Sequence, residues 1–156
     1  MIKYPWKQIP KVNGVILARL WPWGNTKRIA LIKHFTKAFQ SVSRFTAFPI
    51  KRTHDESKAY IKVYFDRKPV GGFNENSLAR WYFPWTPIGG NIYVNDFYVD
   101  YNRHNAQEII EHEMCHTLNV AHDEKDPNDL MYPKHNKDEA IGYNAETRQS
   151  LFDATK

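Results

Sequence analysis

The sequence predicts a single α+β domain spanning residues 1–156, and three observations carry this prediction. Segments with strand character occupy much of the first two thirds of the chain. A long segment with helical spacing of its apolar residues lies among them, and helical segments follow residue 105. No internal repeat, low-complexity run or domain boundary divides the chain. The order strand, helix, strands, helix, turn, helix is typical of an α+β fold.

The first half of the chain opens with an expected strand over residues 14–20. A helix is expected over residues 27–42, because apolar residues recur there at helical spacing: Ile29, Ile32, Phe35, Phe39 and Val42. A strand is then expected over 45–50 and a polar loop over 51–58. Residues 59–65 alternate between two faces, which is a clear strand signal.

The second half is expected to start with a loop over residues 66–77 and a strand over 78–83 that Pro84 ends. A further short strand is expected over 91–94. Asn105 and Glu108 have the spacing of a capping box that opens the next helix. A polar loop over 123–129 and a final helix over 144–154 complete the chain.

Composition and charge exclude several classes of protein. Hydrophobic residues make up 42% and charged residues 25%, as in ordinary globular proteins. The net charge of +5 comes from scattered Lys and Arg without a dense basic block, so nucleic acid binding is not expected. No secretory signal or segment long enough to span a membrane is evident, and the single cysteine, Cys115, excludes an internal disulfide.

Residues 112–122 carry the chemistry of this chain. His112 and His116 are four residues apart, so a helix places both imidazoles on one face, where they can share a zinc ion. Glu113 lies beside the first ligand, where its carboxylate can take a proton from water. His122 reaches the same ion only if the chain turns after Leu118, and Asn119 tolerates the left-handed backbone that such a turn needs.

A bare His-Glu-x-x-His pattern also arises by chance in helices, so the surrounding residues matter. His122 stands at the spacing of a third ligand, and Leu130-Met131-Tyr132-Pro133 downstream resembles the Met-turn of the metzincins. The segment from His112 to Pro133 is most similar to the matrixins, the matrix metalloproteinase family. This chain differs by carrying Asn119 where the family has glycine and Asp123 where many matrixins have serine.

The resemblance covers nearly the whole chain, since the upstream elements fall in the matrixin order. It implies a metzincin (zincin-like) domain with a twisted, mostly parallel five-stranded sheet. A long backing helix, the zinc helix and a C-terminal helix complete the expected fold. The lowest strand of the sheet is expected to edge a horizontal active-site cleft.

The expected activity is that of a zinc-dependent endopeptidase. Three neutral imidazoles leave zinc an open position for water, whose pKa falls towards ~7. Glu113 is expected to be the general base that returns the proton to the leaving amine, and Met131 to pack beneath the metal without binding it. One alternative is a catalytically silent, zinc-bound peptide-binding module, and another is a nucleic-acid-binding protein with a structural zinc.

Substrate-binding residues are expected from the resemblance. Leu78 and Ala79 match the edge strand that pairs with an extended peptide, although they also suit a plain sheet strand. Tyr132, Pro133 and His135 resemble the wall of the pocket for the residue after the cut, with His135 where matrixins usually have tyrosine. Glu108 lies one turn before His112 and is either the floor of that pocket or only a capping residue.

One catalytic zinc ion is expected, and calcium binding stays open. Matrixins hold a second, structural zinc, but Arg80 and Tyr93 occupy two of the positions where its histidines belong, and residues 66–77 contain no histidine. A polypeptide substrate, a monomeric chain and no nucleic acid or membrane partner are expected. The family resemblance favours extracellular action. No pro-segment with a zinc-blocking cysteine is apparent, and whether one was removed stays open.

Overall fold

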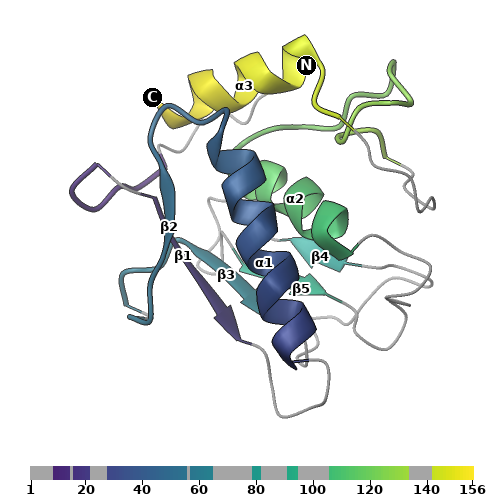
Figure 1. Ribbon diagram of the computed structural model, residues 1–156. Coiled ribbons are helices and arrows are strands. Elements are labelled where there is room, and N and C mark those ends of the chain that lie inside the picture. The colour runs from purple at the N-terminus through teal and green to yellow at the C-terminus, as the bar shows by residue number, and fades with distance from the viewer. Residues whose placement is uncertain are drawn as a thin grey trace.

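The computed structural model describes residues 9–14, 16–21, 28–55, 57–64, 79–81, 91–94, 106–133 and 142–156. Within these residues, helices and strands follow one another in the order that Figure 1 labels. The elements are β1 (Ile16–Trp21), α1 (Arg28–Ser43), β2 (Ile50–Arg52), β3 (Ile61–Tyr64), β4 (Ala79–Trp81), β5 (Asn91–Val94), α2 (Ala106–Thr117) and α3 (Ala145–Thr155).

The strands form one sheet in the order β2-β1-β3-β5-β4. β1 pairs in parallel with both β2 and β3, and β3 pairs in parallel with β5. β4 runs antiparallel to β5 and ends the order on that side. The sheet is therefore mostly parallel, as the resemblance implied, and β4 is the strand that breaks the parallel arrangement.

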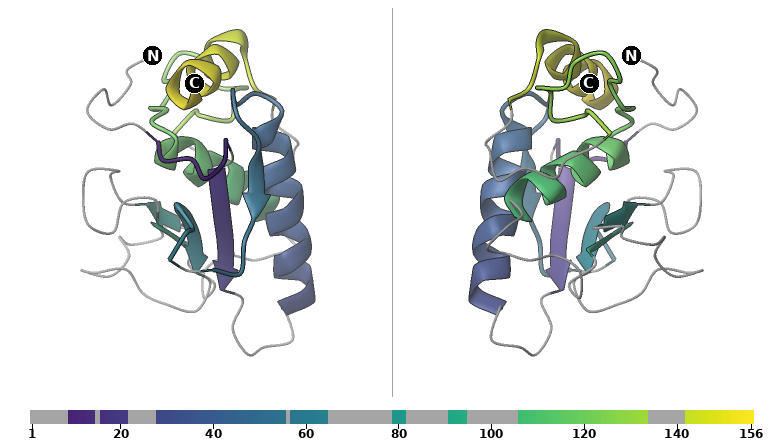
Figure 2. Two further views of the ribbon diagram at one scale, coloured as in Figure 1. Left: turned by 90° about the vertical axis from the view of Figure 1, so that its left-hand side faces the viewer. Right: turned by 90° about the vertical axis from the view of Figure 1, so that its right-hand side faces the viewer.

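α1 and α2 pack against this sheet and against each other. α1 runs beside the strands and contacts both β2 and α2, and α2 contacts β4 and β5 (Figures 1 and 2). α3 lies at one end of the molecule (Figure 2). Fully buried side chains from strands, helices and the loop before α3 form one core, among them Ile16, Phe35, Ile61, Ile92, Ile110, Met114, Leu118, Leu130, Met131 and Leu151.

The two long helical predictions agree with the structure. The predicted apolar face of α1 is buried at Phe35 and Val42, and Phe39 packs partly buried against the core. At α3, the side chain of Asn144 caps the helix by accepting a hydrogen bond from the Thr147 backbone N–H at 2.9 Å. Both helices thus begin and end within one or two residues of the predicted bounds.

The strand predicted over residues 45–50 is wrong, because the structure has turns and bends there and starts β2 at Ile50. Polar side chains, one of them distant in the sequence, satisfy the backbone there in place of a strand ladder. The Thr46 hydroxyl donates to the Phe48 carbonyl at 2.7 Å, and the Thr155 hydroxyl accepts from the Ala47 N–H at 2.8 Å. Two residues of the predicted loop 51–58 belong to β2 instead.

Several predictions lie outside the described residues, namely those for the loop 66–77, Leu78, Asn105 and His135. Among the helices that the structure describes, none is both long and apolar enough to cross a bilayer.

Candidate metal centre

The C-terminal end of α2 turns the chain back towards its own histidines. The Val120 N–H donates to the Cys115 carbonyl at 2.9 Å, and the Asn119 N–H donates to the His116 carbonyl at 3.0 Å. This pair of hydrogen bonds is a Schellman motif, which needs a left-handed residue at its centre. Asn119 supplies that residue with φ 67°, as the sequence predicted. The turn lets His122 approach the face of α2 that carries His112 and His116.

Backbone carbonyls fix the two helix histidines. His116 Nδ1 lies 2.8 Å from the Val120 carbonyl, and His112 Nδ1 lies 2.7 Å from the Leu130 carbonyl. A carbonyl oxygen only accepts hydrogen bonds, so each Nδ1 must carry the proton and donate it. The Nε2 atom of each ring is then left with its lone pair, which is the form that binds a metal.

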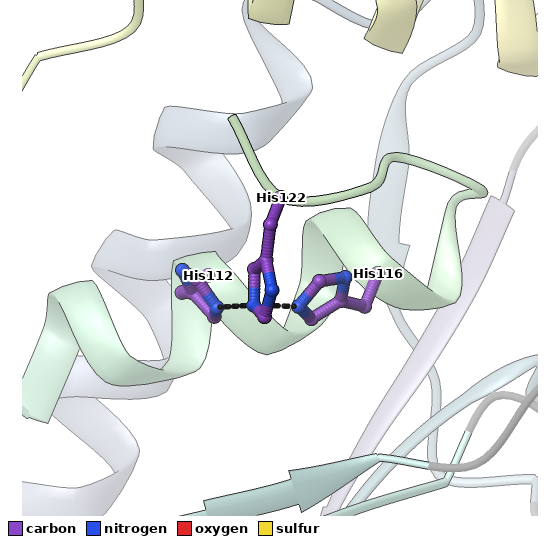
Figure 3. Close-up of side chains that lie close together, drawn as sticks. All are labelled: His112, His116 and His122. Atoms are coloured by element: carbon purple, nitrogen blue, oxygen red, sulfur yellow. Dashed lines mark hydrogen bonds between the residues drawn. The ribbon is translucent and has the colours of Figure 1, made fainter. Parts of the chain in front are cut away.

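The three Nε2 atoms converge on one point from two elements (Figure 3). His122 Nε2 lies 3.2 Å from His112 Nε2 and 3.0 Å from His116 Nε2. Three nitrogens bound tetrahedrally to zinc at its usual bond length would lie about 3.3 Å apart. The two distances from His122 are close to that value, and all three ligand atoms lie within 4.8 Å of one another.

Without a cation, this arrangement is electrostatically unfavourable. His122 has a single Nε2 proton at most, so it can donate to one of the other two rings and leaves the second contact between lone pairs. Burial, followed by the influence of His112 and His122, holds the pKa of His116 well below its usual range, so this ring is neutral. Three imidazole nitrogens that converge in this way fit a zinc ion.

Glu113 is a buried carboxyl group next to the first of these histidines. Its side chain is 9% exposed, and its Oε2 atom has no hydrogen-bond partner among the residues that the structure describes. Burial raises the pKa of Glu113 to about 8. A cation held by the neighbouring His112 would oppose this shift, because it favours the charged carboxylate.

The predicted substrate-binding residues lie in different surroundings. Glu108 is buried in the first turn of α2, Tyr132 is half-buried, and Pro133 is exposed. Ala79 opens β4 and pairs with Val94 of β5.

Residues of the loop between His122 and α3 were missed by sequence reasoning. Asp129 is fully buried, and its carboxylate accepts a hydrogen bond from the Met131 N–H. The preceding carbonyl, that of Leu130, accepts the hydrogen bond from His112 Nδ1. Asn144 donates from its side-chain amide to Asp123 at 2.8 Å and to Asp126 at 3.1 Å, which ties this loop to α3. The available signal was an aspartate directly before the Leu-Met pair of the downstream motif.

Comparison with protein families agrees with this geometry. The family model described as Matrixin matches residues 22–149, a span that includes α1, α2, the three histidines and the start of α3. No curated protein matches the chain. The match covers most of the chain and contains the whole three-histidine cluster, so this protein belongs to the matrixin family, a family of zinc metallopeptidases.

Proposed function

We propose that this protein is a zinc-dependent endopeptidase that cleaves peptide bonds within a polypeptide. The observation that carries the proposal is the convergence of three imidazole Nε2 atoms, within 4.8 Å of one another, beside a buried glutamate. Zinc, when bound there, supplies a Lewis acid that polarises a carbonyl group and makes water more acidic.

His112, His116 and His122 would hold the ion. The two helix rings are oriented by the carbonyls of Leu130 and Val120, so the ligand nitrogens are placed before metal arrives. His122 is the exposed member of the three. One zinc ion per chain at this cluster is part of the proposal.

Glu113 would move the proton. As general base it takes a proton from the attacking water, and as general acid it passes this proton to the leaving amine. Its burial keeps this carboxyl group away from bulk water, next to the first proposed ligand. Met131 is fully buried and directly follows Leu130, whose carbonyl accepts the hydrogen bond from His112. We assign Met131 a packing role beneath the ion.

The substrate would bind along β4. This strand ends the sheet order of the described residues and pairs with β5 on one side only, so its other edge suits an extended peptide. α2, which carries two of the ligands, contacts β4. Leu78 and Ala79 are therefore proposed to bind the peptide backbone. Tyr132, Pro133, His135 and Glu108 are proposed to shape the pocket after the cut.

A peptide-library digest read by mass spectrometry tests the activity. The zinc-loaded protein should cut peptides at internal bonds, and a chelator should stop the cleavage. A protein that holds zinc yet cuts nothing would be a silent peptide-binding module, and the proposed activity would be wrong.

The variant Glu113→Ala tests the role of the base in the same digest. It removes no ligand, so the variant should keep its zinc while losing nearly all hydrolysis. Zinc content by elemental analysis is the control. Turnover above a few per cent of the unaltered protein would contradict the role assigned to Glu113.

A further inference from the structure

The carboxylate of Asp129 is buried in the loop between His122 and α3. It is 0% exposed and accepts three hydrogen bonds from neutral donors. Oδ2 accepts from the Met131 N–H at 3.0 Å and from the Thr147 hydroxyl at 2.7 Å, and Oδ1 accepts from the Asn144 N–H at 2.7 Å. A buried carboxylate needs such partners, and one of these three leads towards the metal centre.

The Met131 N–H and the Leu130 carbonyl belong to the same peptide unit. Because a peptide unit is planar and here trans, its N–H and C=O point in opposite directions. The N–H points to Asp129, and the C=O accepts the Nδ1 proton of His112 at 2.7 Å. The Asp129 carboxylate, the Leu130–Met131 peptide unit and the His112 imidazole therefore form one chain of hydrogen bonds, which ends at the proposed metal position.

The same peptide unit is held on both sides. The Leu130 N–H donates to the Gly142 carbonyl at 2.8 Å, and the Met131 carbonyl accepts from the Asp123 N–H at 2.9 Å. These bonds hold the flanking atoms of Leu130 and Met131. Asp129 supplies the bond to the unit itself.

We propose that Asp129 is a positioning residue that acts on His112 through the Leu130–Met131 peptide unit. This inference rests on the proposed zinc site. Asp129 fixes the plane of the carbonyl that orients the imidazole. Its negative charge also polarises the peptide unit, which makes the carbonyl a stronger acceptor and the His112 Nε2 a stronger ligand.

A purely structural role is the competing explanation, because Asp129 also ties the loop to α3 through Thr147 and Asn144. The molecule offers a matched control for this. Thr147→Val removes the hydroxyl that shares Oδ2 with the Met131 N–H, while it leaves the hydrogen bond from the Met131 N–H to Asp129 in place. The Thr147→Val variant should lower the stability of the fold without weakening the hydrogen bonds that link Asp129 to His112.

The test compares the unaltered protein, Asp129→Asn and Thr147→Val. Zinc affinity is measured by competition with a chromophoric chelator, and the Tm of the zinc-free protein reports stability. Asp129→Asn should weaken zinc binding by roughly tenfold or more, the range found when outer partners of metal ligands are lost. Thr147→Val should lower the Tm and leave zinc affinity equal or tighter, since Oδ2 is then shared by fewer donors.

A proton NMR measurement separates the two histidines in the zinc-loaded protein. In Asp129→Asn the Nδ1 proton of His112 should move upfield while that of His116 stays in place, because His116 donates to Val120 instead. If Asp129→Asn does not fold, Thr147→Val alone distinguishes a positioning role of Asp129 from a purely structural one. It should move the His112 proton downfield, whereas a structural role predicts weaker zinc binding along with the lower Tm.

Zinc affinity unchanged in Asp129→Asn, or lost equally in Thr147→Val, would overturn this inference and leave the proposed function standing. An unaltered protein that binds no zinc would overturn the metal site itself, and the inference with it.

Discussion

His112 and His116 stand on the same face of α2, yet their imidazoles are oriented by very different parts of the chain. His116 donates to a carbonyl four residues away, at Val120, within the turn that ends the helix. His112 donates to a carbonyl eighteen residues away, at Leu130, beyond the third ligand. One anchor is made by local backbone geometry, and the other depends on how a distant loop is held.

The orientations of the two imidazoles therefore depend on different parts of the structure. The local anchor depends on a single backbone conformation at Asn119. The distant anchor depends on Asp129, on the loop around it and on the docking of α3 through Asn144. Substitutions that loosen α3 should therefore disturb the orientation of His112 first. Substitutions that disturb the turn at the end of α2 should affect His116 first.

The largest effect is expected from removing one of the proposed ligands with His116→Ala. Loss of a ligand should weaken zinc binding by more than the roughly 10–100-fold that loss of an outer hydrogen-bond partner costs. Hydrolysis should disappear with the metal. Elemental analysis after extensive dialysis should find one zinc equivalent in the unaltered protein and none in the variant.

His54→Ala is the control for that experiment, because His54 is exposed and lies outside the three-histidine cluster. A full zinc equivalent retained by His116→Ala would show that the ligand assignment is wrong. Two equivalents in the unaltered protein would contradict the single zinc ion of the proposed function.

An intermediate effect is expected from loosening the distant anchor with Leu151→Ala. Leu151 is 0% exposed on α3, so the zinc-free variant should lose about 2–5 kcal/mol of unfolding free energy. Phe152→Ala is the matched control on the same helix, because Phe152 is 47% exposed and its loss should cost within about 0.5 kcal/mol. Denaturant unfolding measures both. Equal losses would mean that α3 is not docked through Leu151.

The smallest effect is expected at the local anchor. Asn119→Ala forces a side chain with a β-carbon to keep φ 67°, which should cost about 1–2 kcal/mol of unfolding free energy. Asn119→Gly keeps that conformation without strain and should cost less, as measured by denaturant unfolding. If glycine proved as costly as alanine, the side-chain amide and not the backbone would be what this position supplies.

The local anchor was within reach of sequence reasoning, whereas the distant one was not. The spacing of the histidines and the tolerance of Asn119 for a left-handed backbone predicted the turn after α2. The partner of His112 is a backbone carbonyl, and every residue has one, so no side-chain pattern singles out Leu130. Asp129 was overlooked for the same reason, since its partners are mostly backbone N–H groups.

The fold shows the same division between periodic and irregular segments. α1 and β3 were predicted from apolar spacing, and α3 from apolar residues expected to dock it, and the structure confirms these elements within a few residues. The error at residues 45–50 arose because Thr46 and Thr155 bind the backbone there, and Thr155 is far away in sequence. The roles predicted for Glu108, Tyr132 and Pro133 stay predictions, because they concern a bound peptide.

The exposure of His122 bears on how fast the metal centre exchanges its ion. Two of the proposed ligands are buried on a helix, and the third is exposed at the start of the loop beyond Asn119. Release of zinc from the proposed site would then need only an outward movement of the segment that carries His122, with α2 intact. We therefore expect the rate of metal exchange to follow the opening of that short segment, and the affinity to follow the carbonyl anchors behind His112 and His116.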